Sequence, residues 1–349
     1  MDSARECLDK LYLMAKPLIF AGTRDDPEKA HEGMIKLCRQ LHRFPILEKM
    51  LLKHPVFNIF PDVPISNAAG FNKNGDIPIE TLKYLGFDRA VIGTVCFDPW
   101  QGNPRPRMQR YSETESLVNW MGLPGVGANQ VFQNLANNKS WLRLTINYMA
   151  TPGKKDDALL SDLQNTILLM RELKTADRFE LNISCPNTHS SSGGMDARRE
   201  YQKNFERMLE VSCPLLHPWQ DLWIKVSPDL DEQGVDDIME IASRYKKVVG
   251  FTTTNTTSHH DSKYIPNSPG KGGGSGNALW ERSLNVQRMF LNKRGSRFDL
   301  IACGGINSTE RLQKRIDYGA SEAQIYTPLI YQGPKLLRDL RGYLNERSN

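Results

Sequence analysis

The stretch "FDLIACGG", residues 298–305, is a short apolar run that ends in two glycines, and this pattern recurs along the chain. From about residue 65 onward, such runs alternate with stretches of helical periodicity. In "DALLSDLQNTILLMREL" (157–173), for example, Leu159, Leu163, Ile167 and Met170 lie along one side of a helix. Eight runs are typical of strands, at residues 65–70, 88–95, 142–148, 178–184, 221–226, 248–255, 298–305 and 322–330.

Strands that alternate with helices indicate βαβ units and a parallel sheet, and eight of them predict a closed α/β barrel, the (β/α)8 or TIM barrel. A doubly wound open sheet is the competing topology. Against it, no GxGxxG motif follows the first strand. Polar residues also recur at the carboxyl ends of nearly every strand, where a barrel places its active site.

Residues 1–55 differ from the rest, and we predict a helical extension there, followed by a barrel domain over residues 56–349. Two amphipathic helices are expected, within residues 4–20 and 25–44. The second has an Asp cap and Pro27 in its first turn. Barrel closure does not require these helices. They form either a cap packed on the barrel, or a membrane-surface hairpin or entrance for an apolar ligand.

Composition excludes several classes of protein. With 39% hydrophobic and 24% charged residues in 349, neither a disordered nor a fibrous chain is indicated. The net charge of +5 is mild, and no dense run of like charge predicts a nucleic-acid surface. Six scattered cysteines have no metal-ligand spacing, so we expect no metal site, no disulfide framework and a reducing compartment. No uninterrupted apolar run is long enough to span a membrane, and no signal-peptide pattern is present.

The strand ends carry an unusual set of amides and cations. One asparagine at a strand end is usually a turn former, but this barrel mouth would collect four asparagines and two lysines. They are Asn119, Asn147, Asn182 and Asn255, with Lys73 and Lys225. Paired amide donors and acceptors suit a flat heterocycle that is rich in carbonyl and N–H groups. The small residues Ala68, Ala69 and Gly70 would let a planar group lie against the backbone.

Three glycine-containing turns follow the late strands, in "GKGGGSG" (270–276), "CGGINS" (303–308) and "YTPLIYQGP" (326–334). In barrels, the loops after the seventh and eighth strands commonly form a phosphate site from backbone N–H groups. The combination therefore predicts a phosphorylated cofactor or substrate.

Cys185 lies in "LNISCPNT" (181–188), between Asn182 and Asn187. A thiol has a larger ionised fraction at neutral pH than a hydroxyl, so it can accept a carbon-bound proton. The alternative is a small buried apolar side chain. Its polar neighbours favour the catalytic interpretation.

These motifs resemble, in order and spacing, those of the dihydroorotate dehydrogenase family, FMN enzymes of pyrimidine synthesis. The resemblance runs from about residue 57 to residue 345. It rests on "AAGFNKNGD" (68–76), "GNPRPRMQR" (102–110), "NISCPNT" (182–188), "IKVSPDL" (224–230), "TNTT" (254–257), "GGSG" (273–276), "CGGI" (303–306) and "IYTPLIYQGP" (325–334).

The resemblance implies FMN held in the barrel mouth and a substrate lying over it. The residues implied for FMN are Ala68, Ala69, Gly70, Lys73, Thr94, Asn147, Asn182, Lys225, Thr254, Ser275, Gly276, Cys303, Gly304, Gly305, Ile325, Tyr326 and Thr327. Those implied for dihydroorotate are Lys73, Asn119, Asn182, Asn187, Asn255 and Thr256. Cys185 would remove a proton from C5 of dihydroorotate while hydride leaves C6 for the flavin.

The N-terminal helices resemble those of the quinone-linked class of the family, which is peripheral on a membrane. We therefore expect a quinone acceptor, with His31 and Arg110 beside its passage, and a place on the cytoplasmic face of a bacterial inner membrane. Cysteine is instead the usual base in the cytosolic classes of the family. A cytoplasmic enzyme using a soluble acceptor such as fumarate is the alternative. The loops "THSSSGGMDARRE" (188–200) and "GLPGVG" (122–127) also depart from the quinone class.

Two other functions are compatible with parts of the pattern. A barrel lyase could use Lys225 as a Schiff-base amine, and would be colourless. A flavin-binding barrel with a changed substrate, or with catalysis lost, would hold FMN that dihydroorotate does not reduce.

Overall fold

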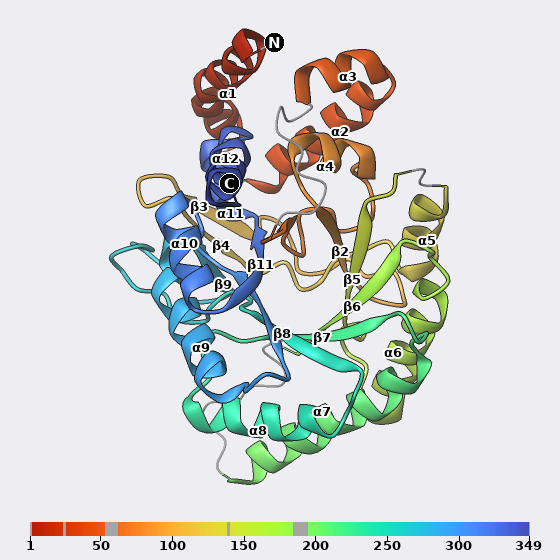
Figure 1. Cartoon of the computed structure of the whole chain (residues 1–349). Coiled ribbons are helices and arrows are strands. Elements are labelled where there is room, and N and C mark those ends of the chain that lie inside the picture. The colour runs from red at the N-terminus through yellow and green to blue at the C-terminus, as the bar shows by residue number, and fades with distance from the viewer. Residues whose placement is uncertain (1, 24–25, 53–61, 138–139, 184–194, 349) are drawn as a thin grey trace.

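The computed structural model describes residues 2–23, 26–52, 62–137, 140–183 and 195–348. Within these ranges eight parallel strands close into a barrel in the order β1–β11–β10–β8–β7–β6–β5–β2 (Figure 1). The strands are β1 (Ile65–Asn67), β2 (Arg89–Val95), β5 (Arg143–Tyr148), β6 (Ala176–Asn182), β7 (Asp221–Val226), β8 (Val248–Thr253), β10 (Asp299–Cys303) and β11 (Ala320–Ile325). The predicted (β/α)8 barrel is therefore confirmed.

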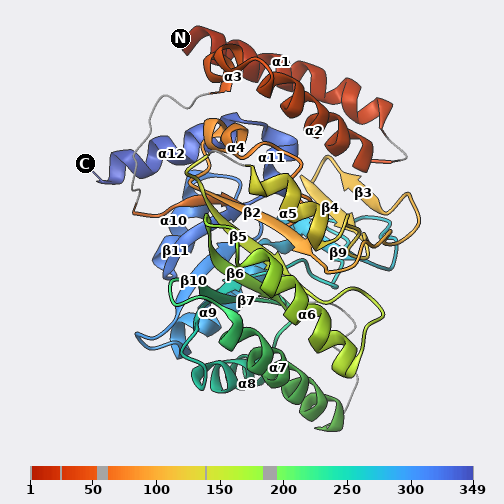
Figure 2. The same cartoon turned by 90° about the vertical axis from the view of Figure 1, so that its right-hand side faces the viewer.

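Helices cover the outside of the barrel, as Figures 1 and 2 show. They are α4 (Ile79–Leu85), α5 (Ala128–Ala136), α6 (Asp156–Met170), α7 (Met195–Leu215), α8 (Glu232–Ser243), α9 (Trp280–Lys293), α10 (Thr309–Asp317) and α12 (Lys335–Ser348). Each buries an apolar side against the strands. In α6, Leu163, Ile167 and Met170 are fully buried, which agrees with the periodicity of the sequence.

A second sheet, which the sequence did not predict, lies beside the barrel mouth. It has three antiparallel strands in the order β3 (Met108–Tyr111), β4 (Ser116–Asn119) and β9 (Gly273–Gly276). Asn119 is therefore the last residue of a strand of this sheet and not of a barrel strand. Gly276 permits the close approach of β9, because a Cβ on it would lie 2.2 Å from the Glu115 carbonyl oxygen. The predicted run 322–330 is also strand only in its first part, since α11 (Thr327–Gln332) follows β11.

Three N-terminal helices, α1 (Asp2–Gly22), α2 (Glu28–His42) and α3 (Pro45–Leu52), lie beyond the end of the barrel (Figures 1 and 2). The sequence predicted the first two. Helix α1 is fastened to the end of α11 by polar groups. The Tyr12 hydroxyl donates to the Ile330 carbonyl at 2.6 Å, and the Lys16 ammonium donates to the Tyr331 carbonyl at 2.9 Å.

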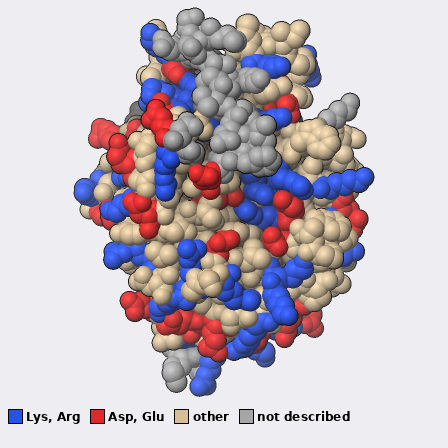
Figure 3. All heavy atoms as spheres, viewed as in Figure 1, with Lys and Arg blue, Asp and Glu red and all other residues tan. Residues whose placement is uncertain are grey.

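Large apolar side chains are exposed on these N-terminal helices and on the turn between α2 and α3. They are Leu11, Leu13, Met14, Leu18, Ile19, Leu37, Phe44, Ile46, Leu47 and Met50. Leu18 is 77% exposed and Ile46 is 87% exposed. Figure 3 shows uncharged residues over the top of the molecule where α3 lies, with charges of both signs mixed over the barrel below. Among the described residues, no helix is long and apolar enough to cross a membrane.

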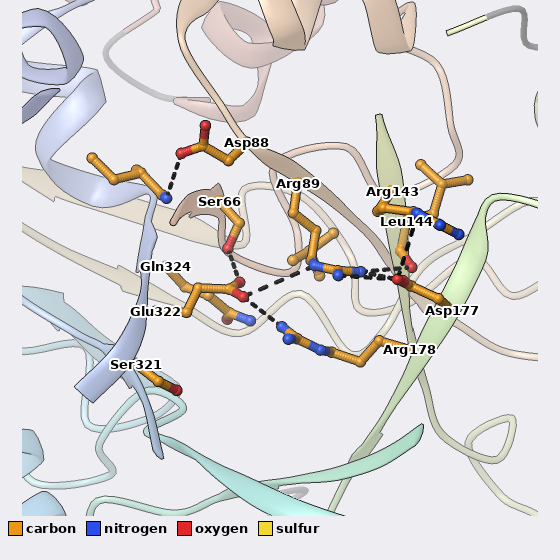
Figure 4. Close-up of polar contacts among 12 residues, drawn as sticks. Ser66, Asp88, Arg89, Arg143, Leu144, Asp177, Arg178, Ser321, Glu322 and Gln324 are labelled. Atoms are coloured by element: carbon orange, nitrogen blue, oxygen red, sulfur yellow. Dashed lines mark hydrogen bonds and ion pairs between the residues drawn. The ribbon is translucent and has the colours of Figure 1, made fainter. Parts of the chain in front are cut away.

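The inside of the barrel contains buried polar side chains, and Figure 4 shows one cluster of them in which charges are paired. The Glu322 carboxylate accepts hydrogen bonds from Ser66 Oγ and Arg178 Nη1, both at 2.6 Å. Arg89 lies 3.9 Å from the same carboxylate and also pairs with Asp177. Burial raises the pKa of Glu322, but the charges of Arg178 and Arg89 outweigh it and lower the pKa overall. This cluster joins strands β1, β2, β6 and β11.

We predict that Glu322→Gln lowers the free energy of unfolding by roughly 2 to 4 kcal/mol, because it leaves the half-buried Arg178 guanidinium without its carboxylate. Urea unfolding of the purified chain measures this loss. The control is Glu206→Gln, which breaks the exposed pair with Arg244 and should cost less than about 1 kcal/mol. Equal losses in the two variants would contradict a structural role for the interior pair.

Candidate active site

A cavity of about 1760 Å³ lies at the carboxyl ends of the barrel strands, between the barrel, the second sheet and α2. Most residues predicted for cofactor and substrate line it. They are Ala68, Ala69, Gly70, Lys73, Thr94, Asn119, Asn182, Lys225, Thr254, Asn255, Thr256, Ser275, Gly276, Cys303, Gly304, Gly305, Ile325, Tyr326 and Thr327. Asn147 is fully buried beneath this surface. Cys185 and Asn187 lie outside the described residues.

Three of the four predicted asparagines join with Thr94 in one hydrogen-bonded chain across the cavity floor, whereas Asn119 Nδ2 donates to the Gly273 carbonyl. Asn255 Nδ2 donates to Asn182 Oδ1 at 3.1 Å, and Asn182 Nδ2 donates to Thr94 Oγ1 at 3.2 Å. Thr94 Oγ1 in turn donates to Asn147 Oδ1 at 2.6 Å. The residues come from β2, β5, β6 and the segment after β8, so barrel closure is what brings them together.

Two residues that the sequence analysis missed, Glu180 and Gln324, lie below this chain. Glu180 is fully buried and accepts from Asn147 Nδ2 at 2.6 Å and from Gln324 Nε2 at 3.0 Å. Gln324 Oε1 accepts from Lys225 Nζ at 3.3 Å. The sequence did contain one sign of Glu180, an acidic residue inside the predicted strand "RFELN" (178–182). A buried acid requires hydrogen-bonding partners.

Lys225 also lies 3.8 Å from Cys303 Sγ, to which it donates a weak hydrogen bond. Burial raises the pKa of Cys303, so its thiol is protonated at neutral pH. Cys303 therefore acts as a small neutral side chain on the wall of the cavity.

The turn of Gly304 and Gly305 is held open by two arginines of α10. Arg315 Nη2 donates to the Gly304 carbonyl at 2.7 Å, and Arg311 Nη1 donates to the Gly305 carbonyl at 2.8 Å. Both guanidiniums lie over the Trp280 ring, 5.0 and 4.7 Å from its centroid. Both glycines have positive φ, which side chains rarely adopt. The turn thus presents backbone to the cavity, as an anion site requires.

The N-terminal side of the cavity is closed by α2. The His31 ring lies 5.9 Å from the rings of both Phe71 and Tyr326. Burial, with the charge of Lys73 acting in the same direction, lowers the pKa of His31 to about 4. The imidazole is therefore neutral at physiological pH.

A buried ion pair attaches α2 to the loop before β3. Arg107 donates from Nε and Nη2 to the two carboxylate oxygens of Glu28, at 2.9 and 2.8 Å. Burial raises the pKa of Glu28, but the hydrogen bonds and charges of Arg107 and Arg105 outweigh it and lower the pKa overall. Burial also lowers the pKa of Lys73 to about 8, and the Glu28 charge opposes that fall.

Arg110, predicted to accompany His31, does not contribute to the described lining of the cavity. Its Nη2 donates to the Phe20 and Thr23 carbonyls, both at 3.0 Å, and its guanidinium lies 4.2 Å from the centroid of the Phe20 ring. Arg110 therefore binds the C-terminal end of α1. Of the two residues predicted beside the quinone passage, His31 lines the cavity and Arg110 contacts the end of α1.

We predict that the chain loses stability as the pH falls from about 6.5 toward about 4, in part through His31. Its pKa is about 4 in the folded chain against an ordinary 6.5, so in this range the unfolded state binds a proton that the folded state does not. His31→Gln should reduce the slope of unfolding free energy against pH. The control His259→Gln changes an exposed histidine and should keep the wild-type slope. An unchanged slope in His31→Gln would contradict the assignment.

Comparisons with known proteins agree with the family that the order of motifs resembles. A family model described as Dihydroorotate dehydrogenase matches residues 51–347. Over 337 residues the chain is 33% identical to dihydroorotate dehydrogenase (quinone) from Acinetobacter baylyi, covering 94% of this chain and 98% of that one. The protein of the same name from Thermosynechococcus vestitus is 32% identical, with 95% of each chain covered.

A solved structure has the same fold. DHODH from Eimeria tenella in complex with ferulenol superposes with a TM-score of 0.77, covering 92% of this chain and 91% of that chain, at 23% identity. At this identity the likeness concerns the fold alone. The family match over most of the chain and the relatives above 30% identity carry the assignment, and the chain belongs to the dihydroorotate dehydrogenase family.

Proposed function

We propose that the chain oxidises dihydroorotate to orotate in pyrimidine biosynthesis, using FMN in the barrel mouth and a quinone as the final electron acceptor. One observation supports this best. A single cavity joins a floor of ordered amides, a backbone cradle at Gly304 and Gly305, and an aromatic wall formed with α2. These three surfaces suit a flat heterocycle, a phosphate and an apolar acceptor.

The residues present fit FMN. The glycine turn and Gly276 offer backbone to a phosphate, and Thr327 Oγ1 donates to Ser275 Oγ at 2.9 Å, which joins the two sides of that cradle. Lys225 is 3% exposed and lies on the cavity wall, where its charge suits the electron-rich end of a reduced flavin. FMN, when bound, supplies the hydride acceptor and the route for electrons to the quinone.

Dihydroorotate would lie over the flavin and be held by Lys73, Asn119, Asn182, Asn187, Asn255 and Thr256. With a pKa of about 8, Lys73 is mostly protonated at neutral pH and can pair with the substrate carboxylate. Asn255 Oδ1 accepts from the Thr256 backbone N–H at 2.9 Å, which orients this amide at the cavity. The amides can then match the N–H and carbonyl groups of the pyrimidine ring.

Cys185 is our candidate for the base. Its thiolate would take the proton from C5 as hydride leaves C6, and the S–H formed would later lose that proton to water. The neighbouring Asn182 lies on the cavity wall at the end of β6, so the segment that follows starts at the site.

The quinone proposal rests on α1, α2 and α3. Their exposed apolar side chains suit a lipid surface, which they would contact peripherally. The rings of His31 and Tyr326 line the cavity on the side of these helices, and the buried Phe71 ring packs against both. Relatives covering nearly the whole chain are named dihydroorotate dehydrogenase (quinone). We propose the cytoplasmic face of a bacterial inner membrane as the location.

We predict a yellow protein whose flavin absorbance bleaches when dihydroorotate is added without oxygen. The reduced protein is then mixed with a short-chain quinone or with fumarate in separate cuvettes. Reoxidation by quinone supports the whole proposal, whereas reoxidation by fumarate alone would remove the quinone. A colourless protein that borohydride traps with a carbonyl substrate would instead indicate Schiff-base chemistry at Lys225.

We predict that Cys185→Ser slows flavin reduction by dihydroorotate near pH 7 and moves its pH dependence upward, because a hydroxyl ionises less readily than a thiol. Stopped-flow absorbance under anaerobic conditions measures the rate. Cys213→Ser changes a buried cysteine of α7 and serves as the control, with the wild-type pH profile expected. A wild-type profile in Cys185→Ser would exclude Cys185 as the base.

A further inference from the structure

We propose that Glu180 is a positioning residue: as the shared acceptor beneath the cavity floor it holds Asn147 and Gln324, and through them it orients groups that meet the flavin and the substrate. This inference rests on the proposed function, because it assumes FMN over that floor. It concerns a residue that does not line the cavity itself.

Three uncharged donors converge on the Glu180 carboxylate. Asn147 Nδ2 binds Oε1 at 2.6 Å, Gln324 Nε2 binds Oε2 at 3.0 Å, and the Thr252 hydroxyl also donates to Oε2. The donors come from β5, β11 and β8, on different sides of the barrel. A carboxylate has acceptor atoms only, so Asn147 and Gln324 must each turn their NH2 group toward it.

The first branch runs from Glu180 to the substrate side. Because Asn147 Nδ2 donates to Glu180, Asn147 Oδ1 points toward Thr94 and accepts a hydrogen bond from its hydroxyl. Thr94 then accepts from Asn182. Asn182 Oδ1 accepts from Asn255, whose own carbonyl oxygen accepts from the Thr256 backbone N–H. A backbone N–H can only donate, so both ends of the chain impose the same direction.

The second branch is shorter and reaches the cation. Gln324 Nε2 donates to the Glu180 carboxylate, and Gln324 Oε1 accepts from Lys225 Nζ. An ammonium can only donate and a carboxylate can only accept, so Gln324 has one possible orientation. The two buried charges, on Glu180 and Lys225, are thus linked through one neutral amide.

Glutamine at position 180 would replace one of the two acceptor oxygens by an NH2 group, so it could not accept from both Asn147 and Gln324. One of these amides would then face another N–H donor or flip, and a flip would break its hydrogen bond with Thr94 or with Lys225. The substitution would also remove a negative charge close to the flavin, which favours uptake of electrons. Mispaired buried groups weaken binding, and one such loss corresponds to about fivefold to tenfold in affinity.

The test compares wild type, Glu180→Gln and Glu322→Gln. Glu322 is the matched control, because it is also an interior carboxylate but pairs with Ser66 and Arg178 at the other level of the barrel (Figure 4). Three quantities are measured: FMN affinity of the flavin-free chain by flavin fluorescence, the reduction potential of bound FMN, and orotate affinity of the oxidised holoprotein by its spectral change.

Glu180→Gln should bind FMN and orotate about fivefold to tenfold more weakly and shift the flavin potential to more positive values. Glu322→Gln should keep wild-type values of all three, although it unfolds more readily. Wild-type values in Glu180→Gln would overturn the proposal, as would equal changes in Glu322→Gln, which would indicate a general loss of stability.

If Glu180→Gln does not fold, Thr252→Val tests the role of Glu180 instead. This change removes one of the three donors to Glu180, and Thr252 is not among the described residues that line the cavity. The flavin potential should then shift to more negative values by a smaller amount, because the Glu180 charge stays and loses a donor that offsets it. An unchanged potential overturns the proposal. Wild type that binds no FMN would overturn the proposed function itself, and this inference with it.

Discussion

The polar interior of the barrel is the constraint on which the rest of the structure depends. Glu180 and Glu322 are both buried among parallel strands, where water cannot solvate them. A buried carboxylate is stable only when several hydrogen-bond donors contact it. Both Glu180 and Glu322 accept hydrogen bonds from side chains on other strands of the barrel. Barrel closure and side-chain pairing therefore depend on each other, because the donors meet the acids only in the closed order of strands.

This pairing explains why the active site is formed where it is. The hydrogen bonds that satisfy Glu180 continue upward through Asn147 to Thr94, which lines the cavity. The floor of the cavity is thus the upper layer of the barrel's own interior network. Its amides are held before any ligand arrives, so little reorganisation is needed on binding.

The sequence predicted the features that depend on local pattern. Alternating runs predicted the eight strands, and the ordered motifs predicted the family, which the comparisons confirm. Glu180 and Gln324 were missed because their importance depends on which strands face each other across the barrel. The sheet of β3, β4 and β9 was missed for a related reason, since glycines that look like a loop pair with a distant strand. The arginines of α10 that hold the glycine turn gave no local signal either.

The N-terminal helices are joined to the barrel in two different ways, and this bears on how they work. Helix α1 is held through Tyr12 and Lys16 at the end of α11, whereas α2 is held by the buried pair of Glu28 and Arg107 beside the cavity. The Glu28 charge also acts on Lys73, so the attachment of α2 and the charge state of the proposed substrate-binding lysine are coupled. The proposed lipid-facing helices would thus be joined to the proposed site by the pair of Glu28 and Arg107, which Arg105 extends to Glu32 of α2. The proposed enzyme therefore combines a cysteine base with an N-terminal extension that would serve a quinone.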